Sequence, residues 1–131
     1  MRNIRSTTAA VAVVGALALA GSLAIPGTAA AGDGACDRGN FCAWQHTNYD
    51  GHRESWSGDD RFWGNNNNIN DQDSSWRNAG ISGPGVRDHV QVYDGYFLGG
   101  GRTLCLRPGE RVAGNGGAND RGSSHTWTFG C

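Results

Sequence analysis

Short stretches of alternating or clustered apolar residues run along this chain. Residues 89–93 (HVQVY) alternate polar with apolar side chains, as a half-buried strand does. Residues 41–44 (FCAW), 54–56 (ESW) and 102–106 (RTLCL) are similarly short apolar or aromatic stretches. After the N-terminal segment no long stretch has the 3.6-residue period of an amphipathic helix, and the chain contains 22 glycines. The pattern predicts an all-β domain built from short strands and turns.

The N-terminal segment has a different pattern. Arg2 and Arg5 precede an uncharged apolar run over residues 9–24, and small residues follow it. This order is typical of a secretory signal peptide, so we expect residues 1–31 to be removed and residues 32–131 to form one small extracellular domain. A retained membrane anchor is the alternative, but the apolar run is short and rich in Ala and Gly. No later segment is apolar enough to span a membrane, so we expect no membrane contact after cleavage.

Charge excludes one large class of partner. Without Arg2 and Arg5, nine arginines stand against twelve acidic residues, and the chain has no lysine. A weakly acidic domain with scattered arginines lacks the positive footprint of nucleic-acid-binding proteins. We therefore expect no binding of nucleic acid. Separately, we expect the protein to be a monomer.

Four cysteines, Cys36, Cys42, Cys105 and Cys131, indicate two disulfides in a small secreted domain. Three pairings are open. We favour Cys36–Cys42, which closes a short loop, with Cys105–Cys131, which would hold the C-terminal residue on a strand. A zinc site made of four thiolates is disfavoured, because no C-x2-C pair is present.

A repeat organises the domain. Residues 70–75 (NDQDSS) recur 49 positions later as residues 119–124 (NDRGSS). At the same offset Trp44 aligns with Tyr93, Gly51 with Gly100 and Arg53 with Arg102. A fixed period of this length indicates repeated supersecondary units. We expect two four-stranded Greek keys, at about residues 41–80 and 89–131, packed as a sandwich.

Each unit contains a second pattern, which forms a corner. Trp44 is followed after four residues by Tyr49 and then by Gly51, whose left-handed conformation would let the strand fold back. The second unit has Tyr93 but Leu98 at the position of Tyr49. An aromatic-x4-aromatic-x-Gly corner followed by N/D-N/D-x-x-S/T-S resembles the βγ-crystallin Greek-key motif. The resemblance covers nearly all of the expected mature chain and implies a disulfide-braced βγ-crystallin-like sandwich.

The opening CDRGNFCAWQHTNYDGHR, residues 36–53, also resembles the secreted bacterial metalloproteinase-inhibitor family, which has this fold. This resemblance implies a non-enzymatic peptidase inhibitor whose partner is an extracellular peptidase. A rigid scaffold that displays a loop binds with little loss of entropy. Leu98, Cys105 and Leu106 are our candidates for an inhibitory loop. Two alternatives stay open: a calcium-binding structural module without inhibitory activity, and a killer-type antimicrobial protein.

The hexapeptides offer hard oxygen ligands, which suit calcium. The βγ-crystallin resemblance implies two sites, each shared between both hexapeptides. The side-chain ligands would be Asp71, Ser74, Asp120 and Ser123. The carbonyl ligands would be those of Gln45, Gln72, Asp94 and Arg121. Because the sites have few carboxylates, we expect affinities on the order of 10⁻⁴–10⁻³ M. A pair of metal-free turns is the alternative.

The remaining polar and aromatic residues give no catalytic pattern. The four histidines form no HExxH motif, and Ser123, Ser124 and His125 lack the context of a nucleophile. We therefore expect no catalytic residues. Ser75 and Ser124, the last hexapeptide residues, are expected to hydrogen-bond the folded corners. Most of the five tryptophans are expected in the core.

Overall fold

The computed structural model of the chain describes residues 32–65 and 68–131. The expected signal peptide lies outside the described residues. Within the described part, no helix is long and apolar enough to cross a membrane.

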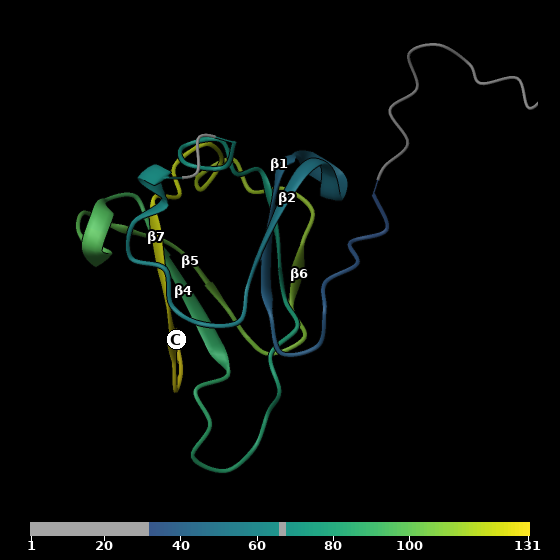
Figure 1. Cartoon of the computed structure of the whole chain (residues 1–131), viewed down its shortest axis with the longest axis vertical. Coiled ribbons are helices and arrows are strands. Elements are labelled where there is room, and N and C mark those ends of the chain that lie inside the picture. Colours follow the sequence, from purple (N-terminus) through teal and green to yellow (C-terminus); the bar gives the residue numbers. More distant parts are fainter. Residues whose placement is uncertain (1–31, 66–67) are drawn as a thin grey trace, which may run out of the picture.

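Two antiparallel sheets form the domain and lie face to face (Figure 1). In spatial order, the first sheet contains β2 (Asp50–Trp56), β1 (Phe41–His46), β3 (Ser75–Asn78) and β6 (Arg111–Val112). The second contains β5 (Arg102–Leu106), β4 (His89–Tyr93) and β7 (Ser124–Thr128). Three short 3-10 helices complete the described elements: η1 (Thr47–Tyr49), η2 (Trp63–Asn65) and η3 (Tyr96–Leu98).

Each unit contributes to both sheets. The first unit supplies β1, β2 and β3, and β6 of the second unit then pairs with β3 through Trp76 and Val112. In the opposite direction, Asp60 of the first unit forms an isolated bridge to His125 in β7. Each unit therefore contributes a strand or a bridge to the sheet of the other unit. The sheets have four and three strands, because the Asp60 segment contributes only a single bridge instead of an eighth strand.

The core lies between the sheets. Val90 and Val92 alternate with less buried residues along β4, as the sequence pattern predicts. Four of the five tryptophans are buried, and Trp56 is half-buried against the core, so the expectation for the tryptophans is confirmed. The buried apolar cluster contains Phe41, Ala43, Trp63, Ile69, Trp76, Val90, Val92, Leu104, Leu106, Ala118 and Trp127.

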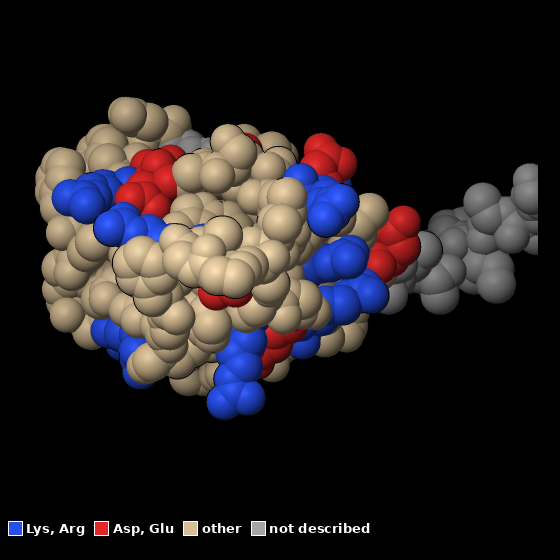
Figure 2. Space-filling view, turned by 90° about the horizontal axis from the view of Figure 1, so that it is seen from below, with Lys and Arg blue, Asp and Glu red and all other residues tan. Residues whose placement is uncertain are grey.

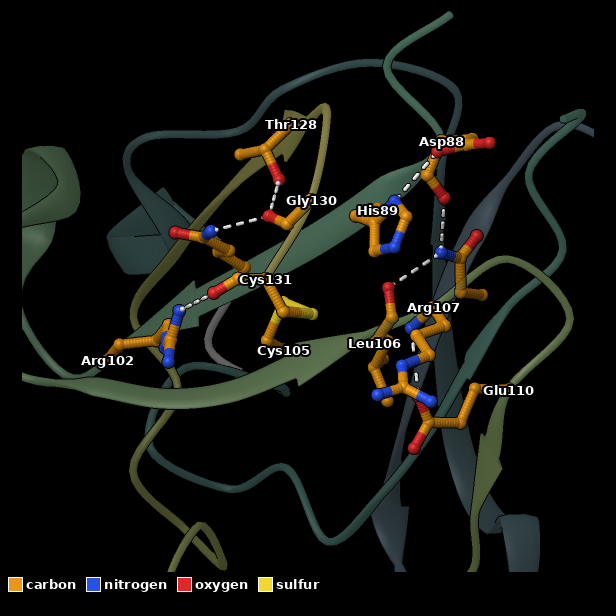
Figure 3. Close-up of a disulfide and its surroundings, with 12 residues drawn as sticks. Asp88, His89, Arg102, Cys105, Leu106, Arg107, Glu110, Thr128, Gly130 and Cys131 are labelled. Atoms are coloured by element: carbon orange, nitrogen blue, oxygen red, sulfur yellow. Dashed lines mark hydrogen bonds and ion pairs between the residues drawn. A yellow bond between two sulfur atoms is a disulfide. The ribbon is translucent and has the colours of Figure 1, made fainter. Parts of the chain in front are cut away.

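Two disulfides brace the ends of the domain, and they have the favoured pairing. Cys36–Cys42 fastens the N-terminal segment to β1. Cys105–Cys131 fastens the C-terminal residue to β5 (Figure 3). Around the second disulfide, Arg102 Nη1 donates to the Cys131 carbonyl at 3.2 Å and Gln91 Nε2 donates to the Gly130 carbonyl at 3.0 Å.

The two ends of the sandwich differ in character. The hexapeptides meet at one end, at the top of Figure 1, and the loop between the two units lies at the other. Seen from the loop end, arginine and acidic side chains lie interspersed around a middle region without charge (Figure 2). On this face, positive charge is not gathered into a single patch.

Candidate functional site

The first unit folds back where β1 meets β2, and Ser75 closes this corner. The Tyr49 N–H donates to Ser75 Oγ at 3.0 Å, and Ser75 Oγ donates to the His46 carbonyl at 2.6 Å. The rings of Trp44 and Tyr49 pack edge to face with centroids 5.2 Å apart. Gly51 has a φ of 78°, which glycine adopts at little cost. The aromatic cover, the glycine corner and the structural serine are confirmed.

The second unit repeats the corner 49 residues later. The Leu98 N–H donates to Ser124 Oγ at 3.1 Å, and Ser124 Oγ donates to the Gly95 carbonyl. Gly100 has a φ of 68°, matching Gly51. The sequence repeat is therefore a repeat of individual hydrogen bonds, and Leu98 fills the place of Tyr49 without changing the backbone.

The two hexapeptides bind each other through reciprocal backbone hydrogen bonds. The Asp71 N–H donates to the Gly122 carbonyl at 2.9 Å, and the Asp120 N–H donates to the Asp73 carbonyl at 2.8 Å. Asp71 and Asp120 have φ values of 54° and 58°, a left-handed conformation that aspartate tolerates better than most residues. The two hexapeptides, which lie 49 residues apart in the sequence, thus form one hydrogen-bonded pair.

The expected side-chain ligands form pairs between the two hexapeptides. Ser74 Oγ donates to Asp120 Oδ1 at 3.5 Å, and Ser123 Oγ donates to Asp71 Oδ1 at 3.0 Å. Each pair combines a serine from one hexapeptide with an aspartate from the other. This is the sharing that the βγ-crystallin resemblance implies. Each serine is buried, with 6% of Ser74 and 3% of Ser123 exposed.

The backbone positions the serines next to the corner strands. The Ser74 N–H donates to the Trp44 carbonyl, and the Ser123 N–H donates to the Tyr93 carbonyl, both at 2.8 Å. The residues that follow these carbonyls are Gln45 and Asp94, whose own carbonyls are expected calcium ligands. In both units, the expected ligands on the strand and in the hexapeptide are therefore neighbours.

A cavity of about 290 Å³ opens at the first of these sites. Its polar lining contains five of the eight expected ligand residues, Gln45, Asp71, Gln72, Ser74 and Asp120, together with His46. Across its rim, Gln45 Nε2 donates to Gln72 Oε1 at 2.9 Å. Hydroxyl, carboxylate and carbonyl oxygens of this kind fit a hard divalent cation. The described residues hold no group of three or more His, Cys, Asp or Glu arranged for a metal ion.

The second site has a different rim. Asp94 and Arg121 stand where the first site has Gln45 and Gln72, and Arg121 Nη2 lies 2.7 Å from Asp94 Oδ2. The hydrogen bond from Arg121, followed by one from the Gly101 N–H, lowers the pKa of the Asp94 carboxyl. A neutral amide pair is thus replaced by an ion pair, a difference that comparing the repeats in the sequence could have shown.

A buried carboxyl lies between the hexapeptides. Asp73 has no exposed surface, and its oxygens accept hydrogen bonds from the Gly122 N–H at 2.8 Å and from Trp76 Nε1 at 2.7 Å. Burial raises the pKa of Asp73 to about 6, and the two hydrogen bonds oppose that rise. Asp73 therefore joins the two hexapeptides from the inside.

The expected inhibitory loop needs a correction. Leu106 is fully buried in β5, so its side chain cannot enter the pocket of a partner in this fold. Cys105 is half-buried in its disulfide with Cys131. Leu98 is half-buried in η3. The alternation of apolar residues that predicts a strand at residues 102–106 also predicts that one face of it is buried, and Leu106 lies on that face.

The sequence interpretation missed the neighbour of Leu98. Phe97 is 72% exposed and has a φ of 56°. Its counterpart in the first unit is Asn48, with a φ of 58°. Asparagine tolerates the left-handed conformation, whereas for a large aromatic residue it is an outlier. The signal was present in the repeat alignment, which sets Phe97 against an asparagine.

Comparisons with known proteins identify the family and the fold. The model of peptidase inhibitor family I36 matches residues 29–105, more than half of the chain. No curated protein gives a significant match.

Solved structures share the fold at low sequence identity. A βγ-crystallin domain structure from a study of the evolution of the eye lens fold is 20% identical, with a TM-score of 0.61 over 75% of this chain and 95% of that chain. A βγ-crystallin from Ciona intestinalis is 19% identical, with a TM-score of 0.54 over 68% and 99% of the two chains. Spherulin 3a from Physarum polycephalum is 19% identical, with a TM-score of 0.54 over 76% and 93%. The chain therefore belongs to peptidase inhibitor family I36, a family of inhibitors and not of enzymes, and it has a βγ-crystallin-like fold.

Proposed function

We propose that this protein is a secreted inhibitor of metalloproteinases and that the corner at η3 contacts the peptidase. The family membership supports inhibition, and the resemblance of residues 36–53 to secreted metalloproteinase inhibitors favours this peptidase class. Two disulfides fit an oxidising, extracellular compartment.

The observation that carries the proposed contact is the combination of strain and exposure at Phe97. A left-handed L-residue costs about 1–2 kcal/mol, and an exposed phenylalanine contributes little to the core. The first unit avoids both costs with Asn48 at the same position. Strained residues concentrate where a protein binds or reacts. Phe97 is thus suited to contact a partner protein, and it does not stabilise the domain.

The surrounding corner holds Phe97 in place. Its N–H donates to the Arg61 carbonyl at 2.6 Å, and its ring stacks on Phe62 with centroids 5.8 Å apart. On one side the Leu98 N–H is fixed by Ser124, and on the other Tyr96 packs on Phe62 at 4.6 Å. A side chain that is fixed before binding loses little entropy on binding. In this interpretation Leu98 positions the segment and Phe97 makes the contact.

A titration of peptidase activity tests the proposal. The oxidised protein is added to a thermolysin-like metalloproteinase at constant calcium concentration, with a serine protease in parallel. We expect stoichiometric inhibition of the metalloproteinase alone. Phe97→Asn, which installs the residue of the first unit, should weaken inhibition at least tenfold without lowering thermal stability.

Phe129 supplies the matched control, because it is another exposed aromatic, 64% exposed, in a different part of the chain. Phe129→Ser should inhibit as well as the wild type. Full metalloproteinase activity at excess protein would reject the proposed peptidase class. Undiminished inhibition by Phe97→Asn would reject only the proposed contact.

We also propose that the protein binds calcium through its hexapeptides, because both Ser–Asp pairs cross between them. In the first site Ser74 and Asp120 would act through their side chains, with the carbonyls of Gln45 and Gln72. Bound calcium would join the two hexapeptides electrostatically. Since only the folded state has the site, calcium should stabilise the fold by about 1.4 kcal/mol at ten times Kd.

Thermal unfolding measures this second proposal. The melting temperature should rise with millimolar calcium and should not respond to calcium in Asp71→Ala combined with Asp120→Ala. Magnesium serves as the control cation, because its strict octahedral preference suits carbonyl-rich loops poorly. An unchanged wild-type melting temperature across the calcium series would reject calcium binding.

A further inference from the structure

We infer that the protein binds one calcium ion, at the first site (Gln45, Gln72, Ser74 and Asp120), and that its own side chains keep the second site (Asp94, Arg121, Ser123 and Asp71) closed. The inference rests on the proposed calcium binding and departs from the two sites that the βγ-crystallin resemblance implies. Because the sites are related by the repeat, each serves as a control for the other.

The Ser–Asp pairs differ first. In the second site Ser123 Oγ and Asp71 Oδ1 lie 3.0 Å apart, an ordinary hydrogen-bond distance. In the first site Ser74 Oγ and Asp120 Oδ1 lie 3.5 Å apart, beyond the usual range. A cation that takes both oxygens as ligands must break a formed hydrogen bond in the second site, but only a marginal one in the first.

The rims differ in charge. Gln45 and Gln72 join the first rim as neutral amides, 2.9 Å apart. At the second rim, Arg121 donates to Asp94 Oδ2 and to the Gly117 carbonyl, each at 2.7 Å, so the guanidinium is held at two points. A guanidinium stays charged at all ordinary pH values, and it repels a divalent cation that approaches nearby.

The second rim has no uncommitted carboxylate to offset this charge. One oxygen of Asp94 accepts from Arg121, and the other accepts from the Gly101 N–H at 2.7 Å. A cation at the second rim therefore meets an ion pair in which Arg121 already balances the charge of Asp94. The first site, in contrast, opens into a cavity whose lining contains all four of its residues, together with His46 and Asp71. At the second site, the Ser123–Asp71 hydrogen bond and the Arg121–Asp94 ion pair form without any metal. Calcium would therefore add stability only at the first site.

Calorimetric titration of the oxidised protein with calcium chloride tests the inference. We expect one ion per chain for the wild type, with any second event at least tenfold weaker. Ser74→Ala should weaken the first event at least tenfold. Thr103→Ala, which removes a hydroxyl outside both hexapeptides, should leave it unchanged. Arg121→Gln, which copies Gln72 into the second unit, should raise the stoichiometry to two.

Backbone amide NMR gives a reading that needs no variant. Calcium should shift the amides of Gln45, Gln72 and Ser74 and leave those of Asp94 and Arg121 in place. Two equal sites in the wild type, or shifts of both groups at the same calcium concentration, would overturn the inference and keep calcium binding. No binding by the wild type would overturn both. A stoichiometry of one in Arg121→Gln would overturn the role of the arginine.

Discussion

At the scale of single residues, the two hexapeptides differ in shape at their fourth position, where Asp73 corresponds to Gly122. The Asp73 carboxylate lies where a side chain on Gly122 would stand: a Cβ there would come within 2.2 Å of Asp73 Oδ2 and 2.5 Å of the Trp63 ring. The pair is complementary, since the carboxylate needs the space and the Gly122 N–H donates to it. An exact repeat would leave no space for two aspartates.

Gly122→Ala should consequently destabilise the fold by about 1–3 kcal/mol through overpacking, because the buried Asp73 cannot move to solvent. Gly116→Ala is the control, since no atom lies within 4 Å of a Cβ at that position. Chemical denaturation of both variants measures the difference. Equal unfolding free energies for the two variants would show that the Asp73 region can rearrange.

Two buried titratable residues act on stability in opposite directions. Burial raises the pKa of Asp73 from 3.8 to about 6, so folding favours its protonated form, and its stabilising contribution is lost as pH rises towards 6. Burial also lowers the pKa of His125 from 6.5 to about 4. Its contribution is present above pH 6.5 and is lost as pH falls towards 4. His125 Nδ1 accepts from Trp63 Nε1, and Nε2 lies 2.8 Å from the Gly58 carbonyl, which fits the neutral ring.

Each of these contributions amounts to about 3 kcal/mol, so they largely cancel between pH 4 and 6. The unfolding free energy of the wild type should change little across this interval on their account. In Asp73→Asn it should rise steeply from pH 4 to pH 6.5, because of these two buried residues only His125 then titrates. In His125→Gln it should fall from pH 4 to pH 6. Denaturation at several pH values measures the slopes, and parallel profiles for all three proteins would contradict the compensation.

At the scale of elements, the sequence predicts strands where apolar residues alternate or cluster, and β1, β2, β4 and β5 lie there. It does not predict β3 or β7, because both bury polar side chains that resemble loop residues. Asn78 in β3 has no exposed surface, and its amide donates to the carbonyls of Asp88 and Leu106. His125 in β7 is buried in the same way. Such polar side chains are stable in the core only because groups distant in the sequence form hydrogen bonds with them. The local sequence pattern does not show those partners.

The candidate site, too, could be predicted only in part from the sequence. The βγ-crystallin resemblance implied that each site is shared between the hexapeptides, and the Ser–Asp hydrogen bonds do cross between them. The closure of the second rim depends on Arg121, whose contacts to Asp94 and Gly117 reach across the fold. The exposure of Phe97 likewise depends on how the corner packs on Phe62. Residue types locate a site, whereas its charge and accessibility arise from tertiary contacts.

The two disulfides close loops of different length. Cys36–Cys42 spans six residues near β1, whereas Cys105–Cys131 spans 26 and fastens the C-terminal end to β5. Removal of each pair by alanine should cost about 2 and about 3–4 kcal/mol respectively, because the longer loop restricts the unfolded chain more. Guanidinium denaturation of the double alanine variants measures both. A larger loss from the Cys36–Cys42 pair would show that the buried Cys42 side chain outweighs loop length.

At the scale of the whole molecule, the two units are similar in sequence but incomplete without each other. The edge strand β6 belongs to the second unit and pairs only with β3 of the first among the described strands. Asp60 and Trp63 of the first unit bond to His125 of the second. The hexapeptides exchange backbone hydrogen bonds as well. The core is shared in the same way, since apolar residues from both units form one buried cluster.

Neither half should therefore fold alone. Residues 32–82 and 86–131, produced separately, should show the NMR dispersion and tryptophan fluorescence of unfolded chains, because each exposes half of a shared core and an unpaired sheet edge. The control is the intact domain cut after folding at a protease site placed in the loop between Ile81 and Arg87. That nicked protein should stay folded and keep its melting behaviour, since the cut removes a connection and no core contact. A native-like spectrum from either isolated half would show that one Greek key suffices and that the exchanged strand and hexapeptide contacts only join two autonomous units.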